Sequence, residues 1–326
     1  MITHKQVLEN FEQQIDFALS NYIPHKYSVE SFNNVVICGL GGSGISGRMI
    51  KTYLSDKISI PIETVSEYHL PAYVSNKTLV ILGSYSGNTE ETLAMFEEAL
   101  SKQASMLILT SGGTLKELAE QHNITCYNLA KDYQPRQALG FSFGFLVQIF
   151  GELIGTDFKN DLIEARDSIK DDNQSLIDSA EAVFDKFKKT LREKFVIVTD
   201  SKFEAVGVRF AQQLQENAKC EAFVNVLPEA NHNVIESYYG HLDTNFILLR
   251  SLDNDRVNVR FDFLNGLLEV ENNRIVNIAV EEYSVRTILE TVYLLDWVSV
   301  WAAEEKGVDA MTVGNIMSLK DYLSEV

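Results

Sequence analysis

The sequence predicts an α/β fold in which two similar halves each form a doubly wound parallel sheet flanked by helices. Short apolar, β-branched runs at 35–38 and 78–83 are typical of buried parallel strands, and each is followed by a segment of helical character. The same order of strand and helix begins again at 195–199. This alternation indicates a parallel sheet with helices on both faces.

Further elements complete both halves. The first half is expected to hold strands at 106–110 and 124–128 and helices at 44–54, 88–102 and 114–122. A helical region at 138–189, interrupted at 156–159, comes next. The second half is expected to hold strands at 222–226, 246–249 and 276–280 and helices at 203–218, 284–305 and 313–324. The predicted boundaries are a helical segment at 1–34, a first domain at 35–150, a helical linker at 151–193 and a second domain at 194–326.

Composition and charge narrow the class of function. The chain has 326 residues, of which 45% are hydrophobic and 23% are charged, as in ordinary globular proteins. A net charge of −18 argues against a nucleic-acid partner, because binding a phosphate backbone requires clustered cations. The N-terminus lacks the apolar core of a signal peptide, and no apolar run is long enough to span a bilayer, so no membrane partner is expected.

The cysteines indicate neither a disulfide framework nor a zinc site. Cys38, Cys126 and Cys220 are widely spaced, and no Cys-x-x-Cys pair occurs. This usage fits a reducing cytoplasm. We therefore expect a cytoplasmic protein that needs no metal and no cofactor.

A turn rich in hydroxyl groups follows the strand at 78–83 and reads Ser-Tyr-Ser-Gly-Asn-Thr-Glu-Glu-Thr over 84–92. Hydroxyl groups, backbone N–H groups and a helix N-terminus converge there, which favours an anion. Because the turn holds no Lys or Arg, the phosphate of a small metabolite is the expected ligand. Helix capping by Asn88 and Glu91 is the alternative, but Ser84, Ser86 and Thr89 exceed what one cap requires.

A glycine-rich turn follows the strand at 35–38 and matches G-x-G-x-x-G over 39–44. Glu63 and Glu67 follow at about the spacing of a ribose-binding carboxylate, so a dinucleotide site is an alternative. Against it, Ser43 stands where a hydroxyl would meet a phosphate, and a dinucleotide site does not need the second turn at 84–92. Both turns lie at carboxyl ends of strands, where doubly wound sheets bind ligands.

The two turns together resemble the sugar isomerase (SIS) domain. Three further motifs, Pro-Arg-Gln-Ala-Leu-Gly at 135–140, Gln-Glu-Asn-Ala-Lys at 215–219 and Pro-Glu-Ala-Asn-His-Asn at 228–233, resemble the bifunctional phosphoglucose/phosphomannose isomerase family. The resemblance covers nearly the whole chain. It implies two SIS subdomains of doubly wound, flavodoxin-like topology and an enzyme of carbohydrate metabolism. That enzyme would interconvert glucose 6-phosphate, and by extension mannose 6-phosphate, with fructose 6-phosphate.

The resemblance also implies catalytic residues. Aldose–ketose isomerisation requires ring opening, proton transfer between C1 and C2, and stabilisation of an enediolate. Glu216 matches the family's proton-transferring base, and His232 matches the ring-opening histidine, which the family contributes from a partner subunit. A homodimer is therefore implied. Lys320 matches a lysine that assists ring opening. The plain alternatives are a solvated helix carboxylate, a surface or capping histidine and a solvated lysine.

Two arginines and a threonine complete the implied site. Arg209 precedes Glu216 by two helical turns, so both can share a face, and it matches an arginine that stabilises the enediolate. Arg136 matches an arginine near the phosphate and C1, and Thr312 would admit the mannose configuration. A surface ion pair and an interdomain salt bridge are the alternatives for the arginines. The phosphate would be bound by Gly42, Ser43, Ser84, Ser86 and Thr89.

The chain departs from the family at Ala211, where a lysine is usual. Three competing functions also remain open: a non-catalytic phosphosugar sensor, a different sugar phosphate isomerase or aminotransferase domain on the same fold, and a nicotinamide dehydrogenase. The co-occurrence of Glu216 and His232 favours the isomerase over the sensor.

Overall fold

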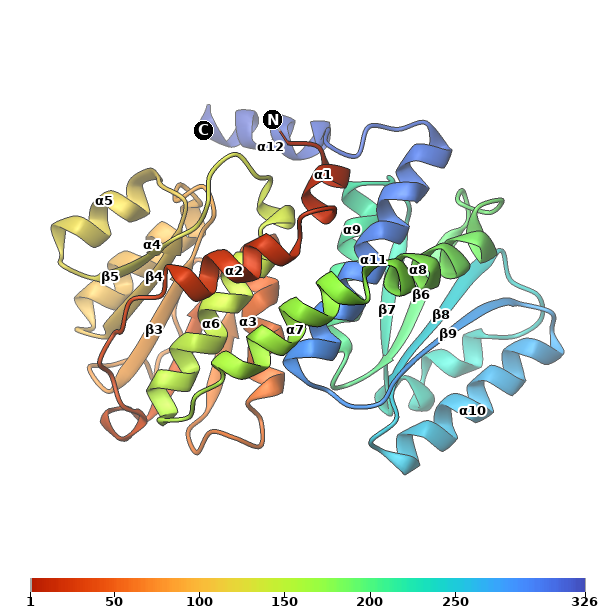
Figure 1. The fold of residues 1–326 in the computed structure, drawn as a ribbon, viewed down its shortest axis with the longest axis horizontal. Coiled ribbons are helices and arrows are strands. Elements are labelled where there is room, and N and C mark those ends of the chain that lie inside the picture. Colours follow the sequence, from red (N-terminus) through yellow and green to blue (C-terminus); the bar gives the residue numbers. More distant parts are fainter. Residues whose placement is uncertain (1, 326) are drawn as a thin grey trace. The chain divides into compact units, whose positions relative to one another are not determined.

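The computed structural model describes residues 2–325, and the chain divides into two compact units (Figure 1). Unit 1 is built mainly from Glu9–Asn173 with Ser284–Glu290. Unit 2 is built from Thr3–Leu8, Gln174–Tyr283 and the chain from Thr291 onward. The helical region expected to link the halves is divided between the units, because α7 (Lys159–Asp171) belongs to unit 1 and α8 (Asn173–Phe187) almost wholly to unit 2.

Unit 1 contains a five-stranded parallel sheet with the strand order β2-β1-β3-β4-β5. Its strands are β1 (Asn34–Cys38), β2 (Ile62–Val65), β3 (Thr78–Gly83), β4 (Ser105–Thr110) and β5 (Thr125–Asn128). This is the flavodoxin-like order, in which the chain reverses direction across the sheet between β1 and β3. This place of reversal is the topological switch point of the sheet, where such sheets bind ligands. The two sequence-predicted turns follow β1 and β3, so both lie there.

Helices cover both faces of the first sheet, because alternate strand residues point to opposite sides. Val80 and Leu82 pack with α4 (Glu90–Ser101) and α5 (Gly113–Gln121). Ile37 and Ile81 face α3 (Gly41–Tyr53) and α6 (Leu139–Ile154). The α6 helix is apolar and buried nearly all round, because α2 (Glu12–Ser20) and α7 cover its outer side (Figure 1).

Unit 2 contains a four-stranded parallel sheet with the order β7-β6-β8-β9. Its strands are β6 (Lys194–Asp200), β7 (Ala222–Leu227), β8 (Thr244–Ser251) and β9 (Arg274–Val280). On one face, α10 (Asp255–Val270) packs on Val196 and Val198. On the other face, α9 (Glu204–Glu216) lies over Ile197 and Thr199, and α8 and α11 (Val285–Lys306) pack there through aromatic pairs.

The short remaining elements are α1 (His4–Leu8), α12 (Gly314–Ser324) and four 3-10 turns: η1 (Val29–Ser31), η2 (Pro135–Gln137), η3 (Glu229–His232) and η4 (Val234–Ser237). Every strand and helix predicted from the sequence is present, with ends shifted by a few residues. Among the described strands and α-helices, β2 and α10 were not predicted. In α10, the run Val257-Asn-Val-Arg-Phe-Asp-Phe alternates as a strand would, yet Asn254 accepts a hydrogen bond from the Val257 amide and begins a helix.

All three cysteines are free thiols. Burial raises the pKa of the Cys38 thiol to about 12 and that of the Cys126 thiol to about 11, so both resist ionisation. Between residues 2 and 325, no helix combines the length and the apolar character that a bilayer crossing requires.

Candidate functional site

The helices that follow the two turns of unit 1 begin without a side-chain cap. No side chain caps α3 after Leu40 or α4 after Thr89. Asn88, the residue that could have capped α4, instead accepts a hydrogen bond from the Thr114 amide at 2.9 Å. Simple capping therefore does not account for the polar residues of the turn, and two positive helix ends are presented at the switch point.

The glycines of the first turn are required by close backbone packing. A Cβ on Gly44 would lie 2.3 Å from the Gly39 carbonyl oxygen, and one on Gly42 would lie 2.6 Å from the Pro135 carbonyl oxygen. The close contact between Gly42 and Pro135 places the turn against η2, which carries Arg136. Gly42 thus serves to bring a buried arginine, 4% exposed, next to the turn.

Tyr85 of the second turn also positions the segment before Arg136. Its hydroxyl donates to the Ala130 carbonyl at 2.8 Å and accepts from the Tyr133 amide at 2.9 Å. Burial raises the pKa of this phenol, so it remains a neutral donor. Gln134 and Gln137 then form a reciprocal capping box around η2. The sequence patterns gave no sign of this role for Tyr85.

The hydroxyl groups of the two turns are linked to one another. Ser43 Oγ accepts a hydrogen bond from the Tyr85 amide at 3.1 Å, which joins the first turn to the second. Ser86 is exposed, and its Oγ accepts from the Asn88 amide at 3.3 Å. Because each oxygen accepts from a backbone N–H, each hydroxyl proton remains available to donate to an anion.

Ser84 is placed differently from the other hydroxyl residues. It is only 2% exposed, and its Oγ accepts from the Gly87 amide at 3.1 Å and lies 2.7 Å from Thr89 Oγ1. When Ser84 donates across this pair, the Thr89 hydroxyl can donate outward. Ser84 therefore supports the turn from within and can act on a ligand through Thr89.

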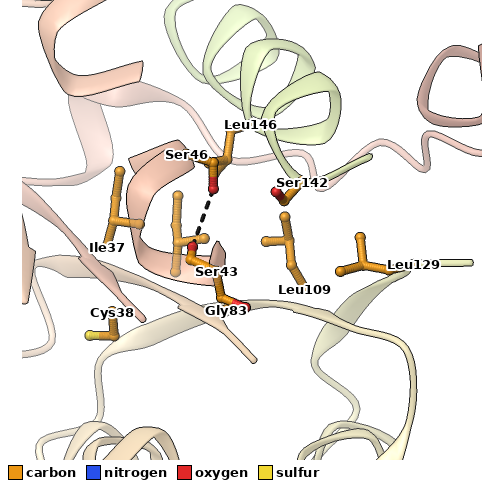
Figure 2. A pocket seen from close by; sticks show the side chains of 10 residues that line it. Ile37, Cys38, Ser43, Ser46, Gly83, Leu109, Leu129, Ser142 and Leu146 are labelled. Carbon is orange, nitrogen blue, oxygen red and sulfur yellow. Dashed lines mark hydrogen bonds between the residues drawn. The ribbon is translucent and has the colours of Figure 1, made fainter. Parts of the chain in front are cut away.

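A small cavity lies beneath the turns and is not the substrate site (Figure 2). It measures about 10 Å³ and is lined by Ser43 and Ser46 of α3, Ser142 of α6 and apolar side chains from the sheet. Ser46 Oγ donates to the Ser43 carbonyl at 3.2 Å across its edge (Figure 2). That volume suits a single water molecule, so a sugar phosphate can bind only outside it.

Glu216 and His232 lie at opposite ends of a strand in unit 2. Glu216 is the half-buried last residue of α9, and its neighbour Gln215 donates to the carbonyl of Ala222, where β7 begins. His232 is exposed at the end of η3, which follows the other end of β7. The six residues of β7 span roughly 17 Å. One chain therefore does not bring this carboxylate and this imidazole together.

Arg209 is buried in an ion pair, on the same α-helix as Glu216 and two turns before it. Its guanidinium lies 2.5 Å from Asp296 Oδ2 of α11, with both side chains 3% exposed. Burial raises the pKa of the Asp296 carboxyl, which the nearby guanidinium counteracts. Gln213 and Asn217 continue this buried row along α9, and Asn217 donates to Ser299 of α11. The ion pair is therefore buried and is not the surface pair that was the alternative for Arg209.

The C-terminal candidates lie on and before α12. Lys320 is exposed on that helix. The Thr312 hydroxyl donates to Asp309 Oδ2 at 2.5 Å, and the Thr312 carbonyl accepts from Lys219. Lys219 ends the Gln-Glu-Asn-Ala-Lys motif, and a lysine at a helix C-terminus is a known partner for the final carbonyl groups. Within residues 2–325, no cluster of three His, Cys, Asp or Glu residues could hold a metal ion.

Comparisons with known proteins first identify the class of protein to which the chain belongs. The SIS domain model matches residues 30–142, and the model of the bacterial phospho-glucose isomerase C-terminal SIS domain matches residues 179–323. The chain is thus a protein with two SIS domains, as the resemblance along the whole chain implied. The C-terminal domain of glucosamine-fructose-6-phosphate aminotransferase from Francisella tularensis shares this fold, with a TM-score of 0.73, 11% identity and coverage of 94% of this chain and 97% of that one.

The particular family follows from similarity along the whole chain. The bifunctional phosphoglucose/phosphomannose isomerase of Caldicellulosiruptor bescii is 31% identical over 331 residues, covering 97% of this chain and 98% of the relative. The chain belongs to the bifunctional phosphoglucose/phosphomannose isomerase family. The D-glucosamine-6-phosphate 4-epimerase of Sulfolobus acidocaldarius is 33% identical over 243 residues, covering 74% of each chain.

Proposed function

We propose that the protein is an aldose–ketose isomerase that interconverts glucose 6-phosphate and mannose 6-phosphate with fructose 6-phosphate. The observation that carries the proposal is near full-length similarity to bifunctional isomerases, which includes the second unit with Glu216 and His232. A phosphosugar sensor would need the turns of unit 1 but not these two side chains. Three free thiols fit a cytoplasmic enzyme.

Substrate anchoring is assigned to unit 1. The hydroxyl groups of Ser43, Ser86 and Thr89, supported by Ser84, would donate to the phosphate, with the N-termini of α3 and α4 providing positive dipole ends. The packing of Gly42 against the Arg136 segment supports a place for this cation beside the phosphate. Local donors suffice in a chain of net charge −18 because they are preorganised by hydrogen bonds.

Proton chemistry is assigned to unit 2. His232, assisted by Lys320, would deliver a proton to the ring oxygen as the C1–O5 bond breaks and the anomeric hydroxyl loses its proton. Glu216 would then remove the proton from C2 of the open aldose and return it to C1 of the cis-enediol, while a proton passes from the C2 hydroxyl to O1, which yields the ketose. The pairing of Arg209 with Asp296 supports a role for Arg209 in holding α9, the helix that ends in Glu216.

Deuterium exchange tests this chemistry directly. In D2O, the wild type should convert glucose 6-phosphate and mannose 6-phosphate in coupled assays and place solvent deuterium at C2 of the aldose and C1 of the ketose. Glu216→Gln should abolish both signals, whereas Glu221→Gln, an exposed carboxylate five residues away, should change neither. A wild type that turns over neither sugar, or exchange that survives Glu216→Gln, would contradict the proposal.

A homodimer in which each subunit donates His232 to its partner is part of the proposal. The separation of Glu216 and His232 by the length of β7 supports it. Co-refolding Glu216→Gln with His232→Ala should restore about a quarter of wild-type activity, because half of a random mixture is heterodimer and each heterodimer has one intact site. A mixture as inactive as its components would show that both residues must come from one chain.

The 4-epimerase relative defines a second candidate function. Its similarity covers 74% of this chain, against 97% for the isomerase of Caldicellulosiruptor bescii. Incubation with glucosamine 6-phosphate, followed by NMR of the C4 proton, separates the two activities. We expect no C4 epimer under conditions in which fructose 6-phosphate is converted, and rapid epimerisation without isomerisation would replace our proposal with this alternative.

A further inference from the structure

Lys219 makes an unusual set of hydrogen bonds just after α9. It lies in the left-handed region, with φ of 54°, past the C-terminal end of the helix. Its ammonium Nζ donates to the carbonyl oxygens of Glu216 at 2.6 Å and Asn217 at 3.3 Å. The same ammonium donates to the carbonyl oxygens of Asp309 and Thr312, both at 2.8 Å. One charge thus joins the end of α9 to the segment between α11 and α12.

These bonds exclude Lys219 from direct contact with a substrate. An ammonium has three N–H donors, and here four backbone carbonyl groups surround it. Two of these carbonyl groups belong to the end of α9, where unpaired oxygens and the negative end of the helix dipole favour a cation. Lys219 is therefore suited to holding backbone segments in place.

The segment that Lys219 holds is itself ordered by further bonds. Asp309 accepts from the Met311 amide at 2.8 Å and from the Thr312 hydroxyl. Lys306, at the end of α11, donates to the Lys219 carbonyl at 2.9 Å, so Lys219 is bound through both its side chain and its backbone. Most of α12 beyond this segment is exposed, including Ile316, Met317, Leu319 and Tyr322. The anchored segment therefore decides where α12 begins.

We propose that Lys219 is a positioning residue that couples the end of α9, with Glu216, to the segment carrying Thr312 and to α12 with Lys320. The inference rests on the proposed isomerase function. These hydrogen bonds of Lys219, here called the clamp, fix the position of Glu216 relative to Thr312 and Lys320. Glu216 is the base that moves the proton, and Thr312 and Lys320 are expected to govern the acceptance of mannose and ring opening. Losing it disturbs catalysis and sugar preference more than phosphate binding, which belongs to unit 1.

Lys219→Met tests the clamp because it keeps the side-chain stem and removes the ammonium. We expect kcat to fall about tenfold or more on both sugars, KM to change less than about threefold, and the ratio of mannose 6-phosphate to glucose 6-phosphate turnover to shift. Hydrogen exchange should accelerate about tenfold over 307–325 and remain unchanged over 84–92. Lys188→Met, which removes an exposed ion pair with Asp185, is the matched control and should change neither.

Each result decides the inference. Faster exchange with unchanged kinetic constants would overturn the coupling, and a rise in KM with unchanged exchange would make Lys219 a substrate-binding residue. If Lys219→Met does not fold, Lys306→Met weakens the clamp from its other side and should give smaller changes in the same direction; no change would again overturn it. Failure of the proposed function is distinguishable, because it appears as an inactive wild type, whereas the exchange measurement compares variant with wild type.

Discussion

The two units share the order of four strands, but in unit 2 a carboxylate accepts hydrogen bonds at the point where unit 1 has its hydroxyl turns. In unit 1, α3 and α4 begin without a side-chain cap beside the hydroxyl turns. In unit 2, Asp200 ends β6 and its buried carboxylate accepts from the Phe203 amide at the start of α9 at 2.8 Å. The same carboxylate accepts from the amide and hydroxyl of Ser251, the last residue of β8, at 2.6 and 2.8 Å.

The same strand order thus carries different polar groups at the carboxyl ends of its strands in the two units. At the switch point of unit 2, the protein supplies its own anion where unit 1 leaves donors for a ligand. The candidate base of unit 2 lies at the other end of α9, at Glu216. We therefore expect substitutions in unit 1 to alter binding and substitutions in unit 2 to alter stability or catalysis.

The largest effect on stability should come from Arg209→Met in unit 2. Removing the guanidinium leaves the Asp296 carboxylate buried without a counter-charge, which costs about 3–5 kcal/mol of unfolding free energy. The folded-state pKa of Asp296 lies above its unfolded value, so the protonated form is the one that folding favours. The loss of unfolding free energy caused by Arg209→Met should therefore shrink as the pH falls and grow as the pH rises through the folded-state pKa of Asp296. Urea titrations from pH 7 to 5 can measure this change.

A double variant separates a structural from a catalytic role for Arg209. Adding Asp296→Leu removes the unpaired charge and should recover most of the lost stability. If Arg209 acts through α9, isomerase activity should return together with stability. A stable double variant without activity would instead support direct stabilisation of the enediolate by Arg209.

A smaller loss of stability is expected from Asp200→Ala, which removes the buried carboxylate at the switch point of unit 2. Three hydrogen bonds to a carboxylate are lost, and we expect about 2–3 kcal/mol of destabilisation. Inorganic phosphate should raise the melting temperature of this variant more than that of the wild type, because the vacated donors can bind an anion. Asp185→Ala, which breaks only an exposed pair with Lys188, serves as the control. An identical response to phosphate in variant and wild type would argue against the comparison.

The smallest effect on stability should accompany a clear loss of binding in unit 1. Ser86→Ala removes an exposed hydroxyl, so the unfolding free energy should change by less than about 0.5 kcal/mol. Loss of one hydrogen bond to a charged phosphate should weaken binding about tenfold. Calorimetry with fructose 6-phosphate measures this effect, with Ser101→Ala of α4 as the control. Unchanged affinity would show that the turn at 84–92 does not hold the phosphate.

Local patterns in the sequence were sufficient for every described strand except β2, for most helices and for both turns of unit 1. The run at 78–83 became β3 without any change of boundary, because a short apolar segment between turn residues has few other options. The SIS resemblance followed from the two turns and the family from the motifs at 135–140, 215–219 and 228–233, because each of these is a contiguous segment of the chain. α10 was missed because its alternating residues match a strand locally, whereas the Asn254 cap and the packing on the second sheet favour a helix.

The sequence by itself determined two parallel-sheet units, their turns and the residue types that chemistry requires. Only the tertiary structure decided that Arg209 pairs with Asp296, that Lys219 holds Asp309 and Thr312, and that β7 separates Glu216 from His232. The reason is physical. A strand or a turn is specified by neighbouring residues, whereas the partner of a charge some ninety positions away depends on how helices pack, which no local pattern encodes.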